Sequence, residues 1–461
     1  MKLNYGTIKV IEMSENCLNF INEKLLPLRD FVKGLNKDTF EPDNISEDSG
    51  INDDPSKARY MRDYQSEAIK QLIFTGMGRG ILDLCTSSGK SFIIANTIWT
   101  LHKQYNSNLK YLVYVPTRQL VDQMYSDFLE YGYDKKFITR LSSGLKKDDK
   151  FNPDAHVIIS NRQYLFTNKD KLPKIDVLFN DECHQTSNSK STTYDFVDNF
   201  DCNIKFACTG TFPKDNISKW NLNSIFGRVV YQQSVTDLQE RGFVSKLKID
   251  MIKVHDSVVD NDRNYLFHRN PIRRFNKDNP SDILFDQAYR DEIEYINKHY
   301  IDLYTPILDQ LEKYNDNMLI LFDRIEFGKN MFELAKQKKI RNSTFYYIDG
   351  SIDVKEREKI RHEFEQSGNN ILFAQTSTFS TGISIKRLTN VVYFMSSRSS
   401  ARIIQSVGRT LRLHKDKDYA QVVDICFDSY KYSHKHMLER MEIYRQTYNK
   451  QQPDNVIELK I

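Results

Sequence analysis

The chain has 461 residues, of which 39% are hydrophobic and 28% charged, and its formal net charge is only +4. This length predicts about three domains, and the apolar content is enough to give each domain a core. The small net charge excludes a protein that binds nucleic acid through a uniform basic field, so local patches would have to supply any such binding.

The cysteine pattern, the first residues and the length of the apolar runs indicate the expected cellular compartment. The six cysteines include no CxxC pair, and several lie in apolar, strand-like runs. This spacing predicts neither a disulfide framework nor a zinc site, and we expect free thiols in a reducing cytoplasm. The first residues lack the apolar core of a signal peptide, and no apolar run is long enough to span a bilayer. We therefore expect a cytoplasmic protein without membrane contacts.

Residues 1–57 are predicted to form a small N-terminal accessory region. A strand is expected over residues 3–11 and an amphipathic helix over 18–32. The stretch that follows, 41–54, is acidic and contains Pro42 and Gly50. This composition predicts a mobile linker.

From residue 58 onward, short apolar segments alternate with helical patterns. They lie at 81–85, 111–115, 156–160, 176–180 and 205–210, and again at 318–322, 344–348, 370–374, 390–394 and 421–427. Strands that are buried on both faces have this continuous apolar character, so the pattern predicts two α/β domains with parallel sheets. The predicted boundaries are 58–248 for the first domain, 249–302 for a connecting insertion and 303–461 for the second domain.

Residues 81–91, ILDLCTSSGKS, predict a phosphate-binding loop between a strand and a helix. The loop consists of Thr86, Ser87, Ser88 and Gly89. These small residues allow backbone N–H groups to surround a polyphosphate at the positive end of the helix. Lys90 is expected to contact the β- and γ-phosphates, and the hydroxyl of Ser91 to ligate Mg²⁺. Because Leu84 stands where the full motif has a glycine, a simple Ser/Gly turn is the alternative for this segment alone.

An acidic pair follows the apolar segment 176–180. We expect Asp181 to hold hydrated Mg²⁺ and Glu182 to activate the water that attacks the γ-phosphate of ATP. An ordinary acidic turn is the alternative for the pair alone, but its occurrence after the Gly-Lys-Ser loop favours nucleotide hydrolysis.

Several further segments occur in an order that is typical of one superfamily. They are MRDYQ (61–65), VPTRQL (115–120), SNRQ (160–163), TGT (209–211), IDGSIDVKERE (348–358), TSTFSTGISI (376–385) and QSVGRTLR (405–412). In these segments the chain resembles a superfamily 2 helicase. The resemblance implies two tandem RecA-like domains that bind ATP and move along nucleic acid.

The resemblance also implies roles for individual residues. Arg62 and Gln65 would recognise adenine, since a Gln amide can pair with the adenine edge, and Gly382 would belong to the nucleotide site. Contacts to nucleic acid are implied for Thr117, Arg118, Arg162, Gln163 and Thr376. Thr209 and Thr211 would couple hydrolysis to movement, whereas a capping turn is the alternative for these two threonines alone.

A role for the segment 405–412 can also be argued from the chemistry of phosphate transfer. Charge that develops on a γ-phosphate requires a guanidinium, and Arg409 and Arg412, three residues apart on a predicted helix, can both present one to the cleft between the domains. Gln405 lies one helical turn before Arg409. A basic helix surface is the alternative for this segment alone.

Three segments resemble a narrower family, the UvsW-type helicases of tailed bacteriophages. They are GLKKDDKF (144–151), NDECH with the later SKS (189–191), and FSTGISIK (379–386). This resemblance implies a monomeric DNA helicase that acts on forked or four-way junctions, in branch migration, recombination and repair.

Three other functions are alternatives to this hypothesis. A DEAD-box RNA helicase typically has His where Gln405 stands, and Ala-Asp where Cys183 and His184 stand. The motor subunit of a restriction complex is disfavoured because no large further domain is expected after residue 428. A nucleic-acid-binding protein with an inactive ATPase would lack Lys90, Glu182 or Arg409.

The stretch from Arg263 to Lys277 combines basic and aromatic residues. Arg269, Arg273 and Arg274 are interleaved with Tyr265, Phe267 and Phe275. Basic side chains neutralise phosphates and aromatic rings stack on unpaired bases, so this stretch is a candidate DNA contact. A solvated loop is the alternative.

Overall fold

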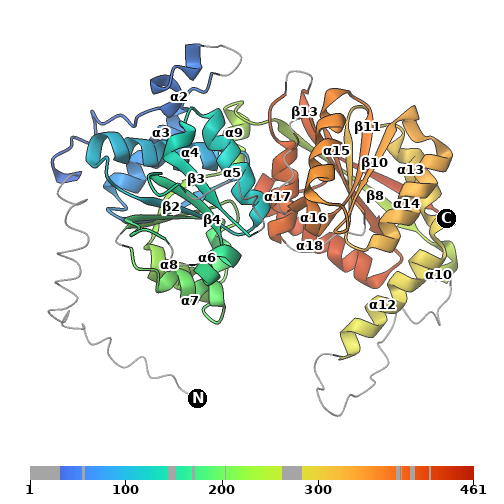
Figure 1. The fold of residues 1–461 in the computed structure, drawn as a ribbon. Coiled ribbons are helices and arrows are strands. Elements are labelled where there is room, and N and C mark those ends of the chain that lie inside the picture. The colour runs from blue at the N-terminus through green and yellow to red at the C-terminus, as the bar shows by residue number, and fades with distance from the viewer. Residues whose placement is uncertain are drawn as a thin grey trace, which may run out of the picture. The chain divides into compact units, whose positions relative to one another are not determined.

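The described residues divide into two units, with the boundary between Gln233 and Ser234 (Figure 1). The computed structural model describes residues 32–53, 58–143, 152–168, 172–202, 204–261, 283–380, 385, 387–394, 400–414 and 417–461. Within these residues, every helix is too short or too polar to cross a membrane.

The first unit is built on a parallel sheet of seven strands in the order β3-β4-β2-β5-β6-β1-β7. The strands are β1 (Arg79–Leu84), β2 (Tyr111–Val115), β3 (Ile138–Leu141), β4 (Val157–Asn161), β5 (Val177–Asp181), β6 (Ile204–Thr209) and β7 (Val229–Gln233). The inner strands β2, β4, β5 and β6 are buried at every position, as expected for a sheet covered on both faces.

Helices cover both faces of this sheet (Figure 1). They are α2 (Ile45–Asp48), α3 (Asp63–Phe74), α4 (Lys90–Thr100), α5 (Arg118–Glu130), α6 (Arg162–Asn168), α7 (Thr192–Asp198) and α8 (Asn216–Phe226). One hydrophobic cluster joins α3, α4 and α5 to one face, and another joins α6, α7 and α8 to the opposite face. Side-chain caps fix several helix starts; for example, the Asp215 carboxylate accepts a hydrogen bond from Ser218 N at α8.

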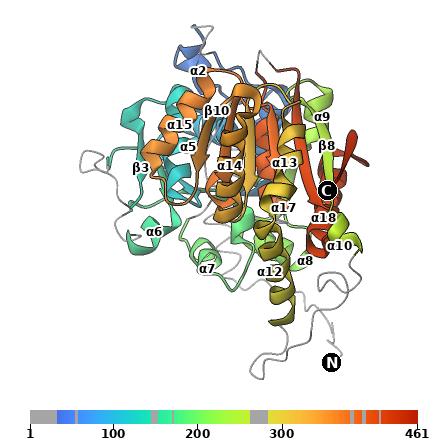
Figure 2. The same ribbon diagram turned by 90° about the vertical axis from the view of Figure 1, so that its right-hand side faces the viewer.

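The second unit repeats this architecture with the strand order β10-β11-β9-β12-β13-β8-β14. Its strands are β8 (Lys246–His255), β9 (Met318–Phe322), β10 (Thr344–Ile348), β11 (Asn370–Gln375), β12 (Asn390–Tyr393), β13 (Tyr419–Phe427) and β14 (Asn455–Lys460). Its helices are α9 (Val235–Glu240), α10 (Ser257–Asn261), α12 (Ile283–Lys298), α13 (Tyr300–Leu311), α14 (Ile325–Lys338), α15 (Val354–Gln366), α16 (Thr376–Ser380), α17 (Ser400–Thr410) and α18 (Lys431–Tyr448). Figure 2 shows α13 and α14 side by side across one face of this sheet, where their apolar side chains form its main hydrophobic cluster. The predicted fold class, two tandem α/β domains with parallel sheets, is confirmed.

The strand order explains where a functional site can form. In the first sheet β6 lies between β5 and β1, and all three strands are parallel. The segments that follow them therefore emerge at the same edge of the sheet. Ligands of open α/β sheets bind at this carboxyl edge, so residues 86–91, 181–184 and 209–211 are brought together by topology alone.

The domain limits differ from the prediction. The boundary at 248 falls inside β8, which pairs with β13 and β14 and belongs to the second sheet. The predicted insertion 249–302 therefore includes most of β8, together with α10 and α12, which are elements of the second unit. Four strands had not been predicted, β3, β7, β8 and β14. Three of them lie at sheet edges, and two of these, β7 and β14, are partly exposed, which permits the polar residues that obscured their pattern.

The predicted mobile linker is also corrected. Ile45 is only 2% exposed and Phe40 only 6%, and both belong to the hydrophobic cluster of the first unit. The acidic stretch therefore packs against the first domain instead of separating from it. The strand predicted over 3–11 lies outside the described residues, as does the helix predicted over 18–32 except for its last residue.

Candidate functional site

The loop after β1 has the backbone shape of a phosphate cradle. Ser87 has a φ of 67°, and Gly89, which precedes the first residue of α4, has a φ of 84°. Both residues are thus in the left-handed region, which favours glycine. A Cβ atom on Gly89 would lie 2.6 Å from Gln65 Nε2, so the Gln65 side chain packs directly against this glycine.

The segment predicted to recognise adenine lies directly against this loop. The Tyr64 hydroxyl and Gln65 Nε2 both donate hydrogen bonds to the Ser88 carbonyl, at 2.7 and 3.0 Å. Gln65 Oε1 in turn accepts a hydrogen bond from Arg62 N at 3.0 Å. The start of α3 is therefore connected to the phosphate loop, and the Gln65 amide retains hydrogen-bonding capacity on both of its atoms.

Lys90 and the acidic pair form a compact charged group. Lys90 Nζ lies 3.7 Å from Glu182 Oε1. Burial acts to lower the pKa of Lys90, but the carboxylates of Glu182 and Asp181 outweigh this effect and raise it. Burial together with the adjacent Glu182 carboxylate raises the pKa of Asp181 to about 6. The lysine thus remains a cation, and the excess of negative charge around Asp181 favours a second cation there.

The surroundings of Lys90 fit a bound nucleoside triphosphate. A Cβ atom on Gly210 would lie 3.0 Å from Lys90 Nζ and 3.3 Å from Thr86 N, so the loop after β6 closely approaches the cradle. Ser88 is 1% exposed, and its hydroxyl is a buried polar atom with no hydrogen-bond partner among the described residues. Backbone N–H groups, an ammonium group and carboxylate oxygens are the donor set that phosphates and Mg²⁺ require.

His184 joins the acidic pair to the threonines after β6. Its Nδ1 atom lies 2.9 Å from Thr209 Oγ1, 3.0 Å from Thr211 Oγ1 and 3.4 Å from Glu182 Oε2. Glu182 itself has a φ of 53°, which turns the chain sharply after β5. Thr209 and Thr211 were predicted as coupling residues, but His184 was missed; its position two residues after Glu182 was the only signal in the sequence.

Ser91, the predicted Mg²⁺ ligand, has a specific neighbour. Its hydroxyl oxygen lies 2.8 Å from the hydroxyl oxygen of Tyr131, the residue that follows α5. No sequence pattern indicated Tyr131.

The predicted nucleic-acid contacts of the first unit lie near the carboxyl ends of its strands. Thr117 Oγ1 accepts a hydrogen bond from Leu120 N at the start of α5, so this side chain also caps the helix, and Arg118 is exposed beside it. At the start of α6, Arg162 donates a hydrogen bond to Thr193 Oγ1 at 3.0 Å, and Gln163 is exposed.

Thr376 differs from these surface residues. It is 1% exposed, and its hydroxyl donates a hydrogen bond to the Phe322 carbonyl at 3.1 Å. Its side chain therefore offers almost no surface to a strand in this conformation.

The arginine segment of the second unit is only partly helical. Gln405 and Arg409 lie one turn apart on α17, and Arg409 donates a hydrogen bond to the Phe379 carbonyl. The prediction that Arg412 shares this helix is wrong, because α17 ends at Thr410. Gly382 and Arg269, Arg273 and Arg274 lie outside the described residues.

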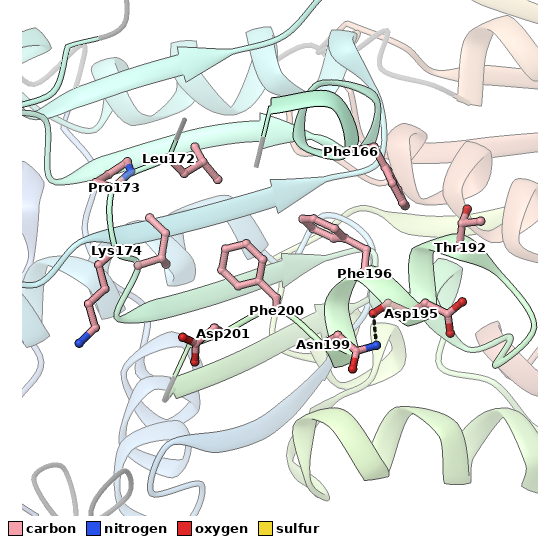
Figure 3. Close-up of a pocket in the computed structure, with 11 residues that line it drawn as sticks. Phe166, Leu172, Pro173, Lys174, Thr192, Asp195, Phe196, Asn199, Phe200 and Asp201 are labelled. Carbon is pink, nitrogen blue, oxygen red and sulfur yellow. Dashed lines mark hydrogen bonds between the residues drawn. The ribbon is translucent and has the colours of Figure 1, made fainter. Parts of the chain in front are cut away.

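Two other features do not coincide with this site. A cavity of about 670 Å³ between α6 and α7 is bordered by the successive rings of Phe166, Phe196 and Phe200, but by no residue of the site (Figure 3). In the second unit, Cys426, Asp428 and His434 lie close enough to share a metal ion. The Asp428 carboxylate already makes hydrogen bonds with His434 at 2.7 Å and Cys426 at 3.7 Å, which account for the cluster without one.

Comparison with known proteins places this geometry in a family. Residues 59–214 match the family described as "Type III restriction enzyme, res subunit", and residues 299–414 match "Helicase conserved C-terminal domain". The ATP-dependent DNA helicase uvsW of Enterobacteria phage T4 is 30% identical over 369 residues, which cover 77% of this chain and 67% of that protein. The chain belongs to the superfamily 2 helicases. It is therefore an ATP-hydrolysing helicase, as the motifs predicted.

More distant relatives match most of this helicase in sequence. The putative ATP-dependent helicase IRC3 of Saccharomyces cerevisiae is 23% identical over 381 residues, covering 80% of this chain and 51% of that protein. The type I restriction enzyme EcoAI endonuclease subunit of Escherichia coli is 23% identical over 390 residues, covering 80% of this chain and 46% of the subunit. The helicase thus spans about half the length of these two relatives.

Solved structures support the fold of this helicase. The type ISP restriction-modification enzyme LlaBIII, solved bound to DNA, superposes with a TM-score of 0.61 at 15% identity, covering 87% of this chain and 31% of that chain. Mss116p, solved with single-stranded RNA and AMP-PNP, gives a TM-score of 0.60 at 14% identity, covering 91% of this chain and 77% of that chain. At such identities the likeness extends to the fold alone.

Proposed function

We propose that this helicase acts on DNA, and that its preferred substrates are forked and four-way junctions. The observation that carries the proposal is the 30% identity with the phage T4 helicase uvsW, which is named as a DNA helicase. The segments that resemble the UvsW-type family favour branched DNA and a monomeric, cytoplasmic enzyme in recombination and repair.

We infer that residues of the first unit have separate roles in the nucleotide site. Residues 86–89 and Lys90 hold the phosphates, while Arg62 and Gln65 contact adenine. Ser91 and Asp181 would hold Mg²⁺, which neutralises phosphate charge when it is bound. Glu182 accepts the proton of the attacking water.

Other residues would link the chemistry to movement. Thr209 and Thr211, which share the imidazole of His184, transmit the state of Glu182 to the loop after β6. Arg409 and Arg412 supply positive charge to the transition state, and Gln405 and Gly382 assist at the nucleotide.

Contacts to DNA are proposed from both units. The first unit contributes Thr117, Arg118, Arg162 and Gln163, and the second contributes Arg269, Arg273 and Arg274. The burial of Thr376 makes it the weakest of the predicted contacts.

The test compares ATP hydrolysis in the presence of single-stranded, duplex, forked and four-way DNA and of RNA, with Glu182→Gln as the inactive control. We expect branched DNA to stimulate hydrolysis most. A larger stimulation by RNA would instead favour the DEAD-box-like alternative, and equal stimulation by every DNA would overturn the junction preference.

The same assay tests the metal requirement. Removal of Mg²⁺ with EDTA should stop hydrolysis, whereas a zinc-selective chelator should leave the rate unchanged. Loss of activity with the zinc chelator would overturn the proposal that the ATPase needs only Mg²⁺.

The basic stretch is tested by replacing Arg269, Arg273 and Arg274 with Ala together. If each contacts a phosphate, the slope of log K for DNA against log salt should flatten by about 0.9 per lost contact. An unchanged slope and an unchanged unwinding rate would identify the stretch as a spacer.

A further inference from the structure

The segment that was predicted to be a mobile linker is bound along the helix that starts at the phosphate loop. Asp43 N donates a hydrogen bond to Thr100 Oγ1 at 2.9 Å, and Ile45 N donates to Asn96 Oδ1 at 2.8 Å. Asn96 and Thr100 both lie on α4 and are fully buried. We call residues 40–53 the N-terminal strap. Its backbone thus follows the helix whose first two residues are Lys90 and Ser91.

The strap also fixes the end of α5. Ser46 is fully buried, and its hydroxyl donates a hydrogen bond to the Tyr131 carbonyl at 2.9 Å. At the next residue, a Cβ atom on Gly132 would lie 2.0 Å from Ser49 Oγ and 3.2 Å from the Ile45 carbonyl oxygen. Only glycine permits this approach, so the strap and the end of α5 are closely fitted.

The Tyr131 side chain then returns to the phosphate loop. Its ring packs edge-on against Phe92, with the centroids 4.9 Å apart, and its hydroxyl lies 2.8 Å from the Ser91 hydroxyl. A serine hydroxyl at the start of a helix can adopt several rotamers. The bond to a ring that is held by Phe92 and by the strap selects one of them.

We propose that Tyr131 is a positioning residue for Mg²⁺, and that it acts by orienting the Ser91 hydroxyl. A cation that ligates a hydroxyl oxygen polarises its O–H bond and makes it a stronger hydrogen-bond donor. The Tyr131 phenol oxygen is placed to accept that bond, which leaves the lone pairs of Ser91 Oγ for the metal. The inference rests on the proposed role of Ser91. It adds that the N-terminal strap supports the metal site through Tyr131.

The test removes one oxygen atom. Tyr131→Phe keeps the ring against Phe92 and deletes only the hydroxyl. The binding of a fluorescent ADP analogue is titrated with Mg²⁺ and repeated in EDTA. We expect the Mg²⁺ concentration for half-maximal effect to rise about 10-fold, as is usual for loss of a partner of a metal ligand. The affinity in EDTA should stay unchanged, because Tyr131 is not proposed to contact the nucleotide.

Tyr133→Phe is the matched control. The Tyr133 hydroxyl also bonds to α4, but it donates to the Ala95 carbonyl at 2.8 Å and belongs to the same hydrophobic cluster. Its loss should change thermal stability without changing the Mg²⁺ dependence. Equal Mg²⁺ shifts in the two variants would show a general effect of packing on α4 and overturn the proposal.

Ser91→Ala separates this inference from the proposed function. If Ser91→Ala shifts the Mg²⁺ dependence but Tyr131→Phe does not, Ser91 remains the ligand and the role of Tyr131 is wrong. If neither variant shifts it, the ligand assignment itself fails. The double variant should be no worse than Ser91→Ala alone, because Tyr131 acts only through Ser91. Additive effects of the two replacements on the Mg²⁺ dependence would contradict an action of Tyr131 through Ser91.

Discussion

Lys90 Nζ lies 3.7 Å from Glu182 Oε1, although Lys90 begins α4 and Glu182 follows β5. The contact pairs the expected phosphate-binding cation with the expected general base. At this distance the ammonium group partly compensates the charge of the carboxylate. A bound γ-phosphate would compete for the same ammonium group, which would leave Glu182 available to accept a proton.

This competition predicts different effects of the two replacements. Lys90→Ala should weaken ATP binding and abolish turnover, because it removes the charge that holds the phosphates. Glu182→Gln should still bind ATP, but its kcat should fall by about 10²-fold or more, since only the general base is lost. Equilibrium nucleotide binding and steady-state hydrolysis measure both. A Glu182→Gln variant with near-normal kcat would remove Glu182 from the mechanism.

His184 should affect coupling more than hydrolysis. His184→Ala removes the imidazole shared by Thr209 and Thr211, so we expect ATP hydrolysis to persist while strand separation per ATP falls several-fold. Unwinding and phosphate release are measured on the same forked DNA. Thr209→Ser is the control, since it keeps the hydroxyl and should keep the coupling. Parallel loss of both activities in His184→Ala would show that the residue supports catalysis itself.

The elements of the site could be predicted because each of them follows a buried strand, and fully apolar strands are legible in a sequence. The expected positions of Lys90 and Glu182 followed from their own motifs and from the rule that parallel strands end at one edge of the sheet. Tyr131 could not be predicted, since it lies 40 residues from Ser91 and meets it only through the packing of α4 on α5. The packing of the N-terminal strap was not predicted, because its many acidic residues are typical of a solvated segment. Phe40 and Ile45 are nevertheless buried.

The end of α17, in the second unit, also could not be predicted from the sequence. Lys417 is 9% exposed, and its ammonium group donates hydrogen bonds to the carbonyls of Leu388, Thr410 and Arg412. Carbonyls at a helix end need such partners, and here a lysine beyond the helix supplies them. Burial lowers the pKa of Lys417 to about 8, with a further contribution from Arg412. No Gly or Pro marks this stop, so the segment 405–412 resembled one continuous helix.

Arg409 should act in the chemical step. Arg409→Ala is expected to leave ATP affinity nearly unchanged and to lower kcat by about 10³-fold, as for other arginines that stabilise phosphoryl transfer. Arg402→Ala, an exposed arginine on the same helix, controls for loss of charge from α17. A raised KM at constant kcat would show that Arg409 binds ground state and transition state alike.

Glu292 gives the second unit a defined dependence on pH. This residue of α12 is fully buried, and its two carboxyl oxygens accept hydrogen bonds from Tyr432 N and Ser433 N, each at 2.9 Å, in the first turn of α18. Burial raises the pKa of Glu292 from 4.5 to about 7, although these bonds and Lys431 oppose the rise. The folded state therefore holds the proton more tightly than the unfolded state.

The sign of the effect follows from that difference. The stability gained from the protonated carboxyl is fully present below pH 4.5 and is lost as the pH rises toward 7, and the whole shift corresponds to roughly 3 kcal/mol. Denaturant unfolding of the full chain should show this loss in the wild type and not in Glu292→Gln. Glu294→Gln, an exposed glutamate on the same helix, should follow the wild type. If the difference in unfolding free energy between wild type and Glu292→Gln stays constant from pH 4.5 to 7, the carboxyl at the start of α18 titrates normally, and its two backbone bonds outweigh its burial.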